Sequence, residues 1–257
     1  MIPHLIDQFR IKEKVAVVTG ASRGIGEGIA IGLADAGAHV IITARDHERL
    51  KIVQKTILER NGNCSIVVGD ITEEEIIQHL IDHAIENFGQ LDIWVSNAGT
   101  SDHPGSFAFE EFPHWHWDQQ IALNLRPHFI AARACAEVMK PGSSIIGISS
   151  IAGIRPAVRF AAYGAAKAGM NNLTETLSIE LAPKGIRANV VSPGQVPTEA
   201  TTRVGGVPPE EFENLGQRIP LGRVGTPTDI AAAVLYLVSD AGSWVTGQNI
   251  VVDGGVT

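Results

Sequence analysis

Cysteine is scarce in this chain. Its 257 residues include two cysteines, Cys64 and Cys135, and neither belongs to a Cys-x-x-Cys pair. We therefore expect both thiols to be reduced and buried in the core, as is usual for a cytoplasmic protein.

Long apolar runs and an excess of positive charge are also missing. No window approaches the roughly 18 uninterrupted apolar residues of a membrane-spanning helix, so we expect no membrane association. The first ten residues carry Asp7 within their apolar part, which does not suit a signal peptide. Lys and Arg number 20 against 28 Asp and Glu, for a net charge of −8. Because no basic stripe outweighs this acidic total, nucleic acid is not an expected partner.

Apolar residues and glycine are plentiful instead. The chain is 44% hydrophobic, which is enough for a substantial core, and many of its 27 glycines stand at the ends of apolar runs. Tight turns from strand to helix require glycine at such places. The length fits one large α/β domain, residues 1–257, better than two small ones.

Short β-branched runs alternate with longer helical patterns. Strands are predicted at Val15–Val18, His39–Thr43, Ser65–Val68, Leu91–Val95, Ile145–Ile148, Ile186–Val191 and Asn249–Val252. Helices are predicted at Gly24–Ala36, Asp46–Arg60, Thr72–Asn87, Asp118–Met139, Ala161–Leu181 and Ile230–Val238. This alternation predicts an α/β fold, a doubly wound parallel sheet covered by helices on both faces. The stretches Thr100–Pro113 and Glu199–Gln217 read as irregular, and loops of that length usually bind substrate.

A glycine-rich turn joins the first strand to the first helix. It reads Thr19-Gly20-Ala21-Ser22-Arg23-Gly24-Ile25-Gly26. Its Gly-x-x-x-Gly-x-Gly spacing is neither Gly-x-Gly-x-x-Gly nor a P-loop. Glycines let the backbone approach a pyrophosphate, and the helix N-terminus offers unpaired N–H groups. We therefore predict phosphate binding here; the alternative is a simple tight turn.

A second motif contains a tyrosine and a lysine on one predicted helix. Tyr163 and Lys167 are four residues apart, a spacing that places both side chains on one helix face. An ammonium beside a phenol favours the phenolate. The ordinary pKa of a tyrosine is about 10, and it would need lowering by roughly 2–3 units for the side chain to exchange protons near neutral pH. Alone, the pair is equally compatible with a surface tyrosine packed on a lysine stem.

Together these motifs resemble the short-chain dehydrogenase/reductase family, from Val15 to Gly255. The further motifs that carry the resemblance are Asp70, Asn97-Ala98-Gly99, Asn124, Ser150, Pro193-Gly194 and Asp253-Gly254-Gly255. The resemblance implies a single-domain Rossmann-like fold. It also implies an oxidoreductase that interconverts a ketone or aldehyde and an alcohol by hydride transfer, with a small-molecule substrate. The tail is similar to that of tetrameric members, which implies a homotetramer, or a homodimer.

The resemblance also implies a catalytic set. Tyr163 would be the general acid or base, and Lys167 would lower its pKa and hold the nicotinamide ribose. Ser150, 13 positions before Tyr163, would hydrogen-bond the substrate oxygen; Ser149 is the less favoured neighbour. Asn124 would complete a water-linked proton relay with Lys167, although by itself it reads as a polar core residue that kinks a helix.

Cofactor contacts follow from the same resemblance. Gly20, Ser22, Arg23, Gly24, Ile25 and Gly26 would form the pyrophosphate turn. Asp70 and Ile71 would contact the adenine, and Asn97, Ala98 and Gly99 would line the cofactor. Val196 and Thr198, after Pro193 and Gly194, would hold the carboxamide, with Pro197 between them. For Asp70 a turn or helix cap remains the alternative.

The end of the second strand bears on the cofactor's phosphate state. NAD binding usually places an acidic residue there, but the chain has Ala44 followed by Arg45. Arginine can bind a 2′-phosphate through a fork of donors, and Arg23 is a second candidate cation. We therefore predict NADP(H), with NAD(H) less favoured and solvated surface arginines as the alternative. Asp46 is expected to cap the next helix.

Histidine and tryptophan alternate at His114-Trp115-His116-Trp117. Residues at i and i+2 do not share a helix face, and no carboxylate completes a ligand set, so we predict no metal site. Trp115 and Trp117 are expected to pack the start of a helix or to wall the substrate cleft.

Two departures from the family pattern stand out. Ser96 replaces an Asn that mainly ties strands together, which puts local packing in question, and Ala166 replaces a frequent Ser. A redox-inactive NADPH-binding sensor or scaffold is the alternative from another class, but such proteins typically lose Tyr or Lys. An epimerase or dehydratase usually needs a longer substrate domain.

The substrate is less defined by the sequence. The segments expected to form its pocket are residues 100–117, 151–160 and 199–217. Arg155 and Arg159 would favour an anionic substrate such as an acyl thioester or sugar acid, although an exposed or interface position is preferred for both. Ile151 and Ile154 suit an apolar ketone or a steroid.

Overall fold

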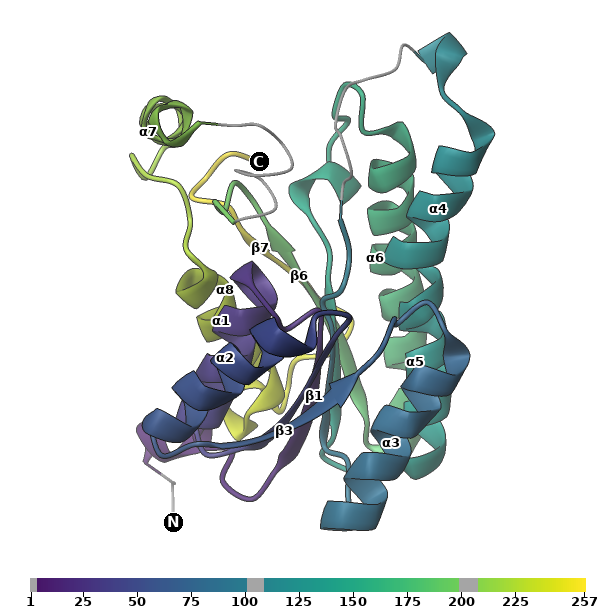
Figure 1. Ribbon diagram of the computed structural model, residues 1–257, viewed down its shortest axis with the longest axis vertical. Helices are drawn as coiled ribbons and strands as arrows, with labels where there is room; N and C mark the ends of the chain where they lie inside the picture. The colour runs from purple at the N-terminus through teal and green to yellow at the C-terminus, as the bar shows by residue number, and fades with distance from the viewer. Residues whose placement is uncertain (1–3, 101–108, 199–207) are drawn as a thin grey trace.

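Seven parallel strands form one sheet between two layers of helices (Figure 1). The structure is a computed structural model that describes residues 4–100, 109–198 and 208–257. The strands are β1 (Val15–Thr19), β2 (His39–Ala44), β3 (Asn63–Val68), β4 (Ile93–Ser96), β5 (Ser144–Ile148), β6 (Arg187–Pro193) and β7 (Asn249–Val252). Their order across the sheet is β3-β2-β1-β4-β5-β6-β7. The predicted fold class, a doubly wound parallel sheet, is confirmed.

The two sheet faces carry separate apolar cores. Along β1, Ala16 and Val18 face one core, and Val15 and Val17 face the other. This alternation follows from the two-residue period of a strand. The first core includes residues of α1 (Gly24–Asp35), α2 (His47–Glu59) and α8 (Pro227–Val238). The second includes residues of α3 (Glu74–Phe88), α5 (Arg126–Val138) and α6 (Ala161–Leu181), with α4 (His114–Asn124) on the same side.

The strand order reverses between β1 and β4. The chain moves outward from β1 to β2 and β3, and then returns to place β4 on the other side of β1. In such sheets a crevice opens at the carboxyl ends of the strands where the direction changes. The glycine-rich turn and Asn97 follow β1 and β4 directly, so both lie at this point.

The predicted long helix Asp118–Met139 is two helices. α4 ends at Asn124, and Leu125 leaves helical geometry, with φ −126° and ψ −53°. Pro127 lies in the first turn of α5. Proline has no amide hydrogen, so it cannot donate the bond that would continue α4 into α5.

The second predicted irregular stretch, Glu199–Gln217, also contains a helix. Residues 199–207 lie outside the described part, but Pro209–Gln217 forms α7. Its start follows common rules, because proline and two glutamates occupy its first turn. Within the first stretch, Phe109–Glu111 forms a single 3-10 turn, and residues 101–108 lie outside the described part. Among the described residues, no helix is long and apolar enough to cross a membrane.

Candidate active site

The glycine-rich turn brings the backbone close to its neighbours. Gly20 and Gly24 have φ of +64° and +60°, a region that glycine enters without steric cost. A methyl group built on Gly26 would lie 2.3 Å from the Gly20 carbonyl oxygen and 2.4 Å from Asn97 Nδ2. Asn97 Nδ2 donates to the carbonyls of Thr19 at 2.8 Å and Gly20 at 3.2 Å. The end of β4 therefore holds the turn in place, and side chains are excluded from it.

A cleft of about 550 Å³ runs from this turn to α6. Most of the predicted cofactor residues line it: Gly20, Ser22, Arg23, Gly24, Ile25, Gly26, Arg45, Asp70, Ile71, Asn97, Ala98, Gly99, Tyr163, Lys167 and Thr198. Its lining also includes residues that were not predicted as cofactor contacts, among them Thr43, Asp46, Arg49, Gly69, Thr100, Gln119, Leu123 and Ile148. Several follow a strand end or lie one helical turn from a predicted contact, which is the signal that would have found them.

Three predicted cofactor residues are not part of this lining. Pro193 is the last residue of β6, and the Gly194 amide donates to the Val252 carbonyl at 2.9 Å. Val196 is buried, and a methyl built on Gly225 would lie 3.1 Å from its Cγ2. In the described structure these residues join β6, β7 and the start of α8.

One end of the cleft contains paired charges. Arg45 Nη1 lies 3.6 Å from Asp70 Oδ2. Asp70 Oδ1 also accepts from the Thr72 amide at 3.0 Å and from Thr72 Oγ1 at 2.8 Å. Burial acts to raise the pKa of Asp70, but the bonds from Thr72 and the charge of Arg45 outweigh it and lower the pKa. Asp70 is thus a charged turn residue at the cleft wall, and its contact with an adenine stays a prediction.

Asp46 caps α2, as predicted. Its Oδ1 accepts from the Arg49 amide at 3.1 Å. The guanidinium of Arg49 lies 3.4 Å from Asp46 Oδ2, and both residues line the cleft beside Arg45. The cap therefore also places an arginine next to the predicted phosphate position.

Lys167 and Tyr163 lie together on α6 at the other end of the cleft. Lys167 Nζ is 5.6 Å from the centre of the Tyr163 ring. The ammonium is buried and donates to the Ile148 carbonyl, at the end of β5, at 2.8 Å. Burial lowers the pKa of Lys167 to about 8. The predicted shared helix face therefore exists, and it points to the end of a central strand.

Tyr163 differs from the sequence-based expectation. Burial raises the pKa of its phenol, and a hydrogen bond with the Ser150 side chain acts in the opposite direction without reversing the shift. The lowering of this pKa by Lys167 therefore stays a prediction, because in the protein alone the pKa is raised. The reason is that the same burial that holds the lysine also penalises a phenolate. Tyr163 is a neutral phenol with a proton to donate.

The two serines after β5 have different environments. Ser149 is buried, and its Oγ donates to the Lys167 carbonyl at 3.1 Å. Ser150 is partly exposed, accepts from the Ala152 amide at 3.1 Å, and hydrogen-bonds Tyr163. Ser150 is therefore the serine that faces the phenol, while Ser149 fixes the backbone of α6.

Asn124 closes the end of α4 over the site. Its Nδ2 donates to the Thr100 carbonyl at 3.1 Å and to Gln120 Oε1 at 2.9 Å, and its Oδ1 accepts from the Thr100 amide at 3.2 Å. A methyl group built on Gly99 would lie 2.5 Å from Asn124 Oδ1 and 3.4 Å from Lys167 Nζ. Gly99 therefore separates Asn124 from Lys167 at close range, and all the predicted catalytic residues meet at one place.

Comparison with known proteins agrees with this geometry. The family model described as Enoyl-(Acyl carrier protein) reductase matches residues 20–257. A solved short-chain type dehydrogenase/reductase from Mycobacterium marinum superimposes with a TM-score of 0.89 at 32% identity, over 99% of each chain. This chain belongs to the short-chain dehydrogenase/reductase family.

Two similar members of the family act on steroids by name. The 3beta-hydroxysteroid dehydrogenase 1 of Eggerthella lenta is 36% identical over 253 residues, which cover 96% of this chain and 95% of that protein. A solved 7 alpha-hydroxysteroid dehydrogenase, complexed with NADH and 7-oxo glycochenodeoxycholic acid, has a TM-score of 0.90 at 33% identity. The superposition covers 99% of this chain and 98% of the steroid dehydrogenase chain.

Ser96 stands where the family usually has an asparagine. It is buried at the end of β4, and its Oγ accepts from Trp94 Nε1 at 3.0 Å. The serine thus bonds its own strand. Ala166 is fully buried in α6, where a small side chain suits close packing.

The histidine–tryptophan run of this short-chain dehydrogenase/reductase packs differently from the prediction. His116 is buried and its ring lies 5.2 Å from that of Phe112, whereas Trp115 and Trp117 are largely exposed. The expectation that the tryptophans pack the start of the helix is therefore wrong. The physical reason is the helical period, which turns one of three successive side chains inward. Residues 4–100, 109–198 and 208–257 contain no cluster of three His, Cys, Asp or Glu suited to a metal.

Proposed function

We propose that this protein is an NADP(H)-dependent oxidoreductase that interconverts a ketone or aldehyde and the corresponding alcohol. The observation that carries the proposal is the meeting of Tyr163 and Lys167, with Ser150 hydrogen-bonded to Tyr163, at one end of a cleft whose other end is a glycine-rich turn. One end supplies a proton, and the other is shaped for a pyrophosphate.

The cleft fits a nicotinamide dinucleotide. Gly20, Gly24 and Gly26 leave room for a pyrophosphate at the N-terminus of α1, where backbone N–H groups favour an anion. Asp70 and Ile71 would flank the adenine, and Gly99 and Thr198 line the path toward α6. When bound, the dinucleotide supplies the hydride chemistry, and the protein supplies orientation and a proton.

Tyr163 is the proposed general acid and base. In reduction its Oη gives a proton to the carbonyl oxygen, and in oxidation it accepts the alcohol proton. Ser150 hydrogen-bonds the same substrate oxygen. Lys167 places a cation beside the ring, held by the Ile148 carbonyl. Asn124 holds Thr100 and would complete the proton relay with Lys167.

The choice of NADP(H) over NAD(H) is proposed from charge. Arg23, Arg45 and Arg49 line the cleft near Ala44, where NAD binding calls for an acid. Asp70 partly neutralises Arg45, so a 2′-phosphate would have to compete with this pair. NADH in the solved 7 alpha-hydroxysteroid dehydrogenase shows that a similar chain accepts the other cofactor.

Replacing Arg45 tests this choice. Arg45→Ala removes a guanidinium that would bind the 2′-phosphate, so we expect kcat/KM for NADPH to fall at least about tenfold, as for loss of one charge-assisted contact. The value for NADH should stay within about twofold. Arg60→Ala is the matched control, because Arg60 pairs with Asp35 at the far end of α2. Equal kcat/KM for both cofactors in the unmutated protein would contradict the proposal.

An apolar ring ketone such as a steroid is the proposed substrate class. The two named relatives support it, and Ile154 and Val158 expose apolar side chains after Ser150. Arg155, a candidate for binding an anionic substrate, instead donates from Nη1 to the Val256 carbonyl at 2.7 Å. A panel of hydroxysteroids, small ketones, 3-oxoacyl thioesters and sugar acids, followed by NADPH absorbance, would identify the class.

Tyr163→Phe tests the proposed chemistry directly. The variant keeps the ring and loses the proton, so we expect kcat to fall by about 10²–10⁴, while binding of NADPH, measured by fluorescence, is retained. Undiminished turnover would refute the role of Tyr163. Tight NADPH binding by the unmutated protein without turnover of any carbonyl would instead favour a sensor or scaffold.

We also propose a cytoplasmic homotetramer. Cys64 and Cys135 are separate, buried thiols, and burial raises the pKa of Cys64 to about 12, so both are kept unreactive. Apolar side chains are exposed on the helices beside the site and near the edge strand β7. Such surfaces are suited to contacts between copies of the chain.

A further inference from the structure

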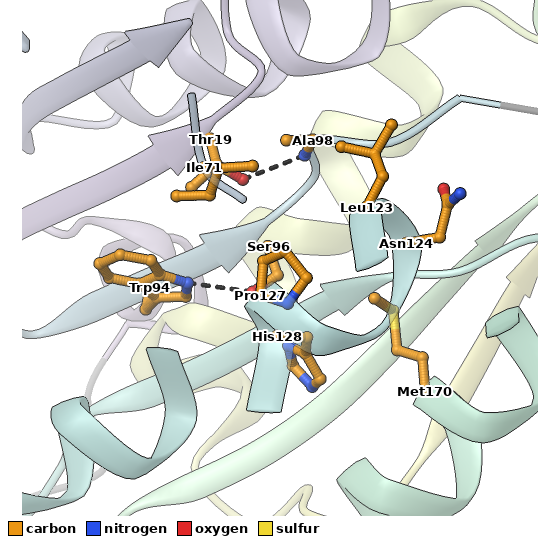
Figure 2. Close-up of a pocket in the computed structure, with 10 residues that line it drawn as sticks. All are labelled: Thr19, Ile71, Trp94, Ser96, Ala98, Leu123, Asn124, Pro127, His128 and Met170. Carbon is orange, nitrogen blue, oxygen red and sulfur yellow. Dashed lines mark hydrogen bonds between the residues drawn. The ribbon is translucent and has the colours of Figure 1, made fainter. Parts of the chain in front are cut away.

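A small cavity of about 10 Å³ lies behind the catalytic residues, among β4, α4, α5 and α6 (Figure 2). Ser96, Asn124 and His128 bring polar atoms to its wall, and Trp94 and Met170 are among the other residues that line it. This volume corresponds to about one water-sized probe. Since Ile71, Ala98 and Leu123 line both this cavity and the cleft, the cavity lies directly behind the site.

His128 is buried beside this cavity, and its contacts define its tautomer. His128 Nε2 lies 2.9 Å from Thr174 Oγ1, and Thr174 Oγ1 donates to the Met170 carbonyl at 2.8 Å. The single hydroxyl hydrogen of Thr174 is thereby used, so Thr174 must accept from His128 Nε2–H. His128 Nδ1 is then an unprotonated acceptor.

This acceptor has no protein donor in the described part of the chain. His128 is 1% exposed, and its Nδ1 is fully buried without a hydrogen-bond partner among those residues. Buried polar atoms in folded proteins nearly always have a partner, either protein or ordered water. His128 lines the small cavity, so a water held there lies beside its ring.

Ser96 offers the complementary group. Its Oγ accepts from Trp94 Nε1 at 3.0 Å (Figure 2). Since a hydroxyl both accepts and donates, its hydrogen is left to donate toward the cavity that Ser96 lines. A polar donor and a polar acceptor thus line one water-sized space.

We propose that this cavity binds a single structural water that accepts from the Ser96 hydroxyl and donates to His128 Nδ1. The water joins β4 to α5, and the His128–Thr174 bond joins α5 to α6, the helix that carries Tyr163 and Lys167. His128 is thereby a positioning residue for that helix. Burial, together with the nearby charge of Lys167, lowers the pKa of His128 to about 4, which keeps the imidazole neutral and Nδ1 free to accept.

The proposal does not depend on the proposed function, and its first test needs no activity. Nitrogen-15 spectra of the histidine rings in the full chain should show His128 as the Nε2–H tautomer with a hydrogen-bonded Nδ1 at pH 7. Water-to-protein NOEs, or a high-resolution crystal structure, should place one water within hydrogen-bond distance of Ser96 Oγ and His128 Nδ1. An Nδ1–H tautomer or a dry cavity would overturn the proposal.

Two variants separate the water from general packing. Ser96→Ala removes the donor, so the Nδ1 resonance should lose its hydrogen-bond shift and the water signal should disappear. Thr174→Val removes the acceptor for Nε2–H, so the ring should switch to the Nδ1–H tautomer. Thr176→Val is the matched control, because Thr176 makes the same bond to the carbonyl four residues earlier but is exposed. An unchanged His128 spectrum in both test variants would overturn the proposal, even if both are destabilised.

Discussion

Burial acts in opposite directions on the two residues of the proposed catalytic pair, Tyr163 and Lys167. It lowers the pKa of Lys167 to about 8 and raises that of Tyr163, because each group loses stabilisation of its charged form. On α6, the buried lysine therefore loses its proton more readily than a free lysine, and the neighbouring phenol holds its proton more tightly than a free tyrosine. In the protein alone Tyr163 therefore stays protonated.

Two histidines, the buried His128 and the partly buried His39, make stability depend on pH. Burial lowers the pKa of His128 to about 4, with a contribution from Lys167, and lowers that of His39, with a contribution from His83. An unfolded histidine titrates near 6.5. The folded state therefore binds these protons less readily, and stability is present above about pH 6.5 and is lost as the pH falls toward the folded pKa.

We expect the free energy of unfolding to fall by about 2 kcal/mol from His128 alone between pH 7.5 and pH 5. Urea unfolding at the two pH values measures this change. His128→Gln should be less stable at pH 7.5 but should lose less stability at pH 5, whereas His47→Gln, at an exposed position in α2, should behave like the unmutated protein. A pH response that His128→Gln leaves intact would show that another group causes it.

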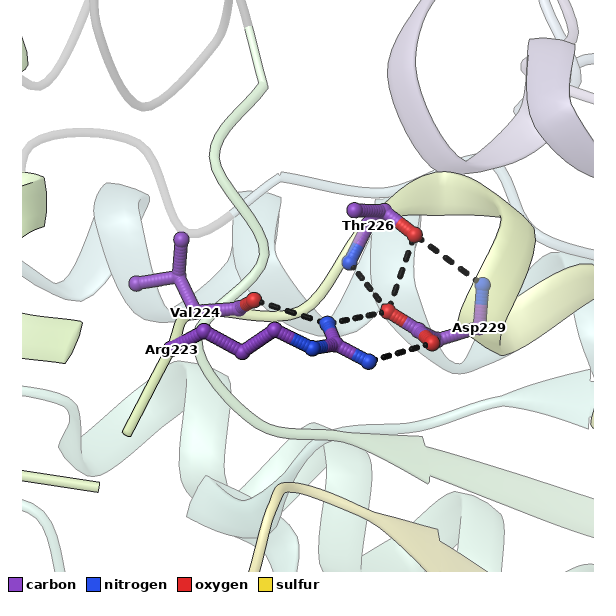
Figure 3. Close-up of polar contacts among 4 residues, drawn as sticks. All are labelled: Arg223, Val224, Thr226 and Asp229. Atoms are coloured by element: carbon purple, nitrogen blue, oxygen red, sulfur yellow. Dashed lines mark hydrogen bonds and ion pairs between the residues drawn. The ribbon is translucent and has the colours of Figure 1, made fainter. Parts of the chain in front are cut away.

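At the scale of elements, α8 begins with an extensive capping network (Figure 3). Thr226 Oγ1 accepts from the Asp229 amide at 3.3 Å, and the Thr226 amide donates to Asp229 Oδ2 at 2.7 Å. Arg223 forms a two-pronged pair with the same carboxylate, at 2.8 and 2.9 Å. A methyl built on Gly28 of α1 would lie 2.4 Å from Pro227 Cβ. The cap therefore holds α8 against α1 behind the glycine-rich turn.

Removing this cap should destabilise the protein without changing its chemistry. Thr226→Ala leaves the Asp229 amide without its side-chain acceptor, so we expect a loss of about 1 kcal/mol in the free energy of unfolding. Thr56→Ala is the control, because Thr56 is a partly exposed residue within α2 whose hydroxyl donates to the Ile52 carbonyl at 3.0 Å and caps no helix. Denaturant unfolding compares the two. Equal stability of both variants would show that the capping bonds of Thr226 contribute nothing measurable.

At the scale of the whole molecule, two sets of exposed apolar side chains bear on contacts between copies of the chain. One lies on the helices α4 to α6, with Trp117, Phe129 and Ile179. The other lies near the edge strand β7, with Val251 and a fully exposed Trp244. Two separate contact surfaces are what a tetramer with perpendicular two-fold axes requires.

Sedimentation of the full chain tests this arrangement. We expect a tetramer, and we expect Phe129→Glu on α5 to dissociate it to dimers, because a buried charge without a partner is costly. Ile52→Glu is the matched control on α2, where the exposed isoleucine belongs to neither surface, and it should remain tetrameric. A monomeric unmutated protein, or dissociation by both changes alike, would contradict the proposed surfaces.

Most of the sheet was predictable because strand signals are local. The β-branched runs at Val15 and His39 define strands whose register pairs Val15 with His39, and the glycine-rich turn marks the cofactor end. The break after Asn124 was missed because the apolar pattern continues across it, although Pro127 was the signal. The helix α7 was missed because nine residues are too few to show a clear period.

The sequence by itself determined the fold class, the glycine-rich turn and the pairing of Tyr163 with Lys167, because these depend on residue type and on spacing along one element. Only the tertiary structure decided which serine faces Tyr163, how Asp70 meets Arg45, and the direction in which each pKa moves. Those outcomes depend on burial and on contacts between residues distant in the chain. The cavity between Ser96 and His128 also depends on such contacts, since its walls come from five separate elements, β1, β4, α4, α5 and α6.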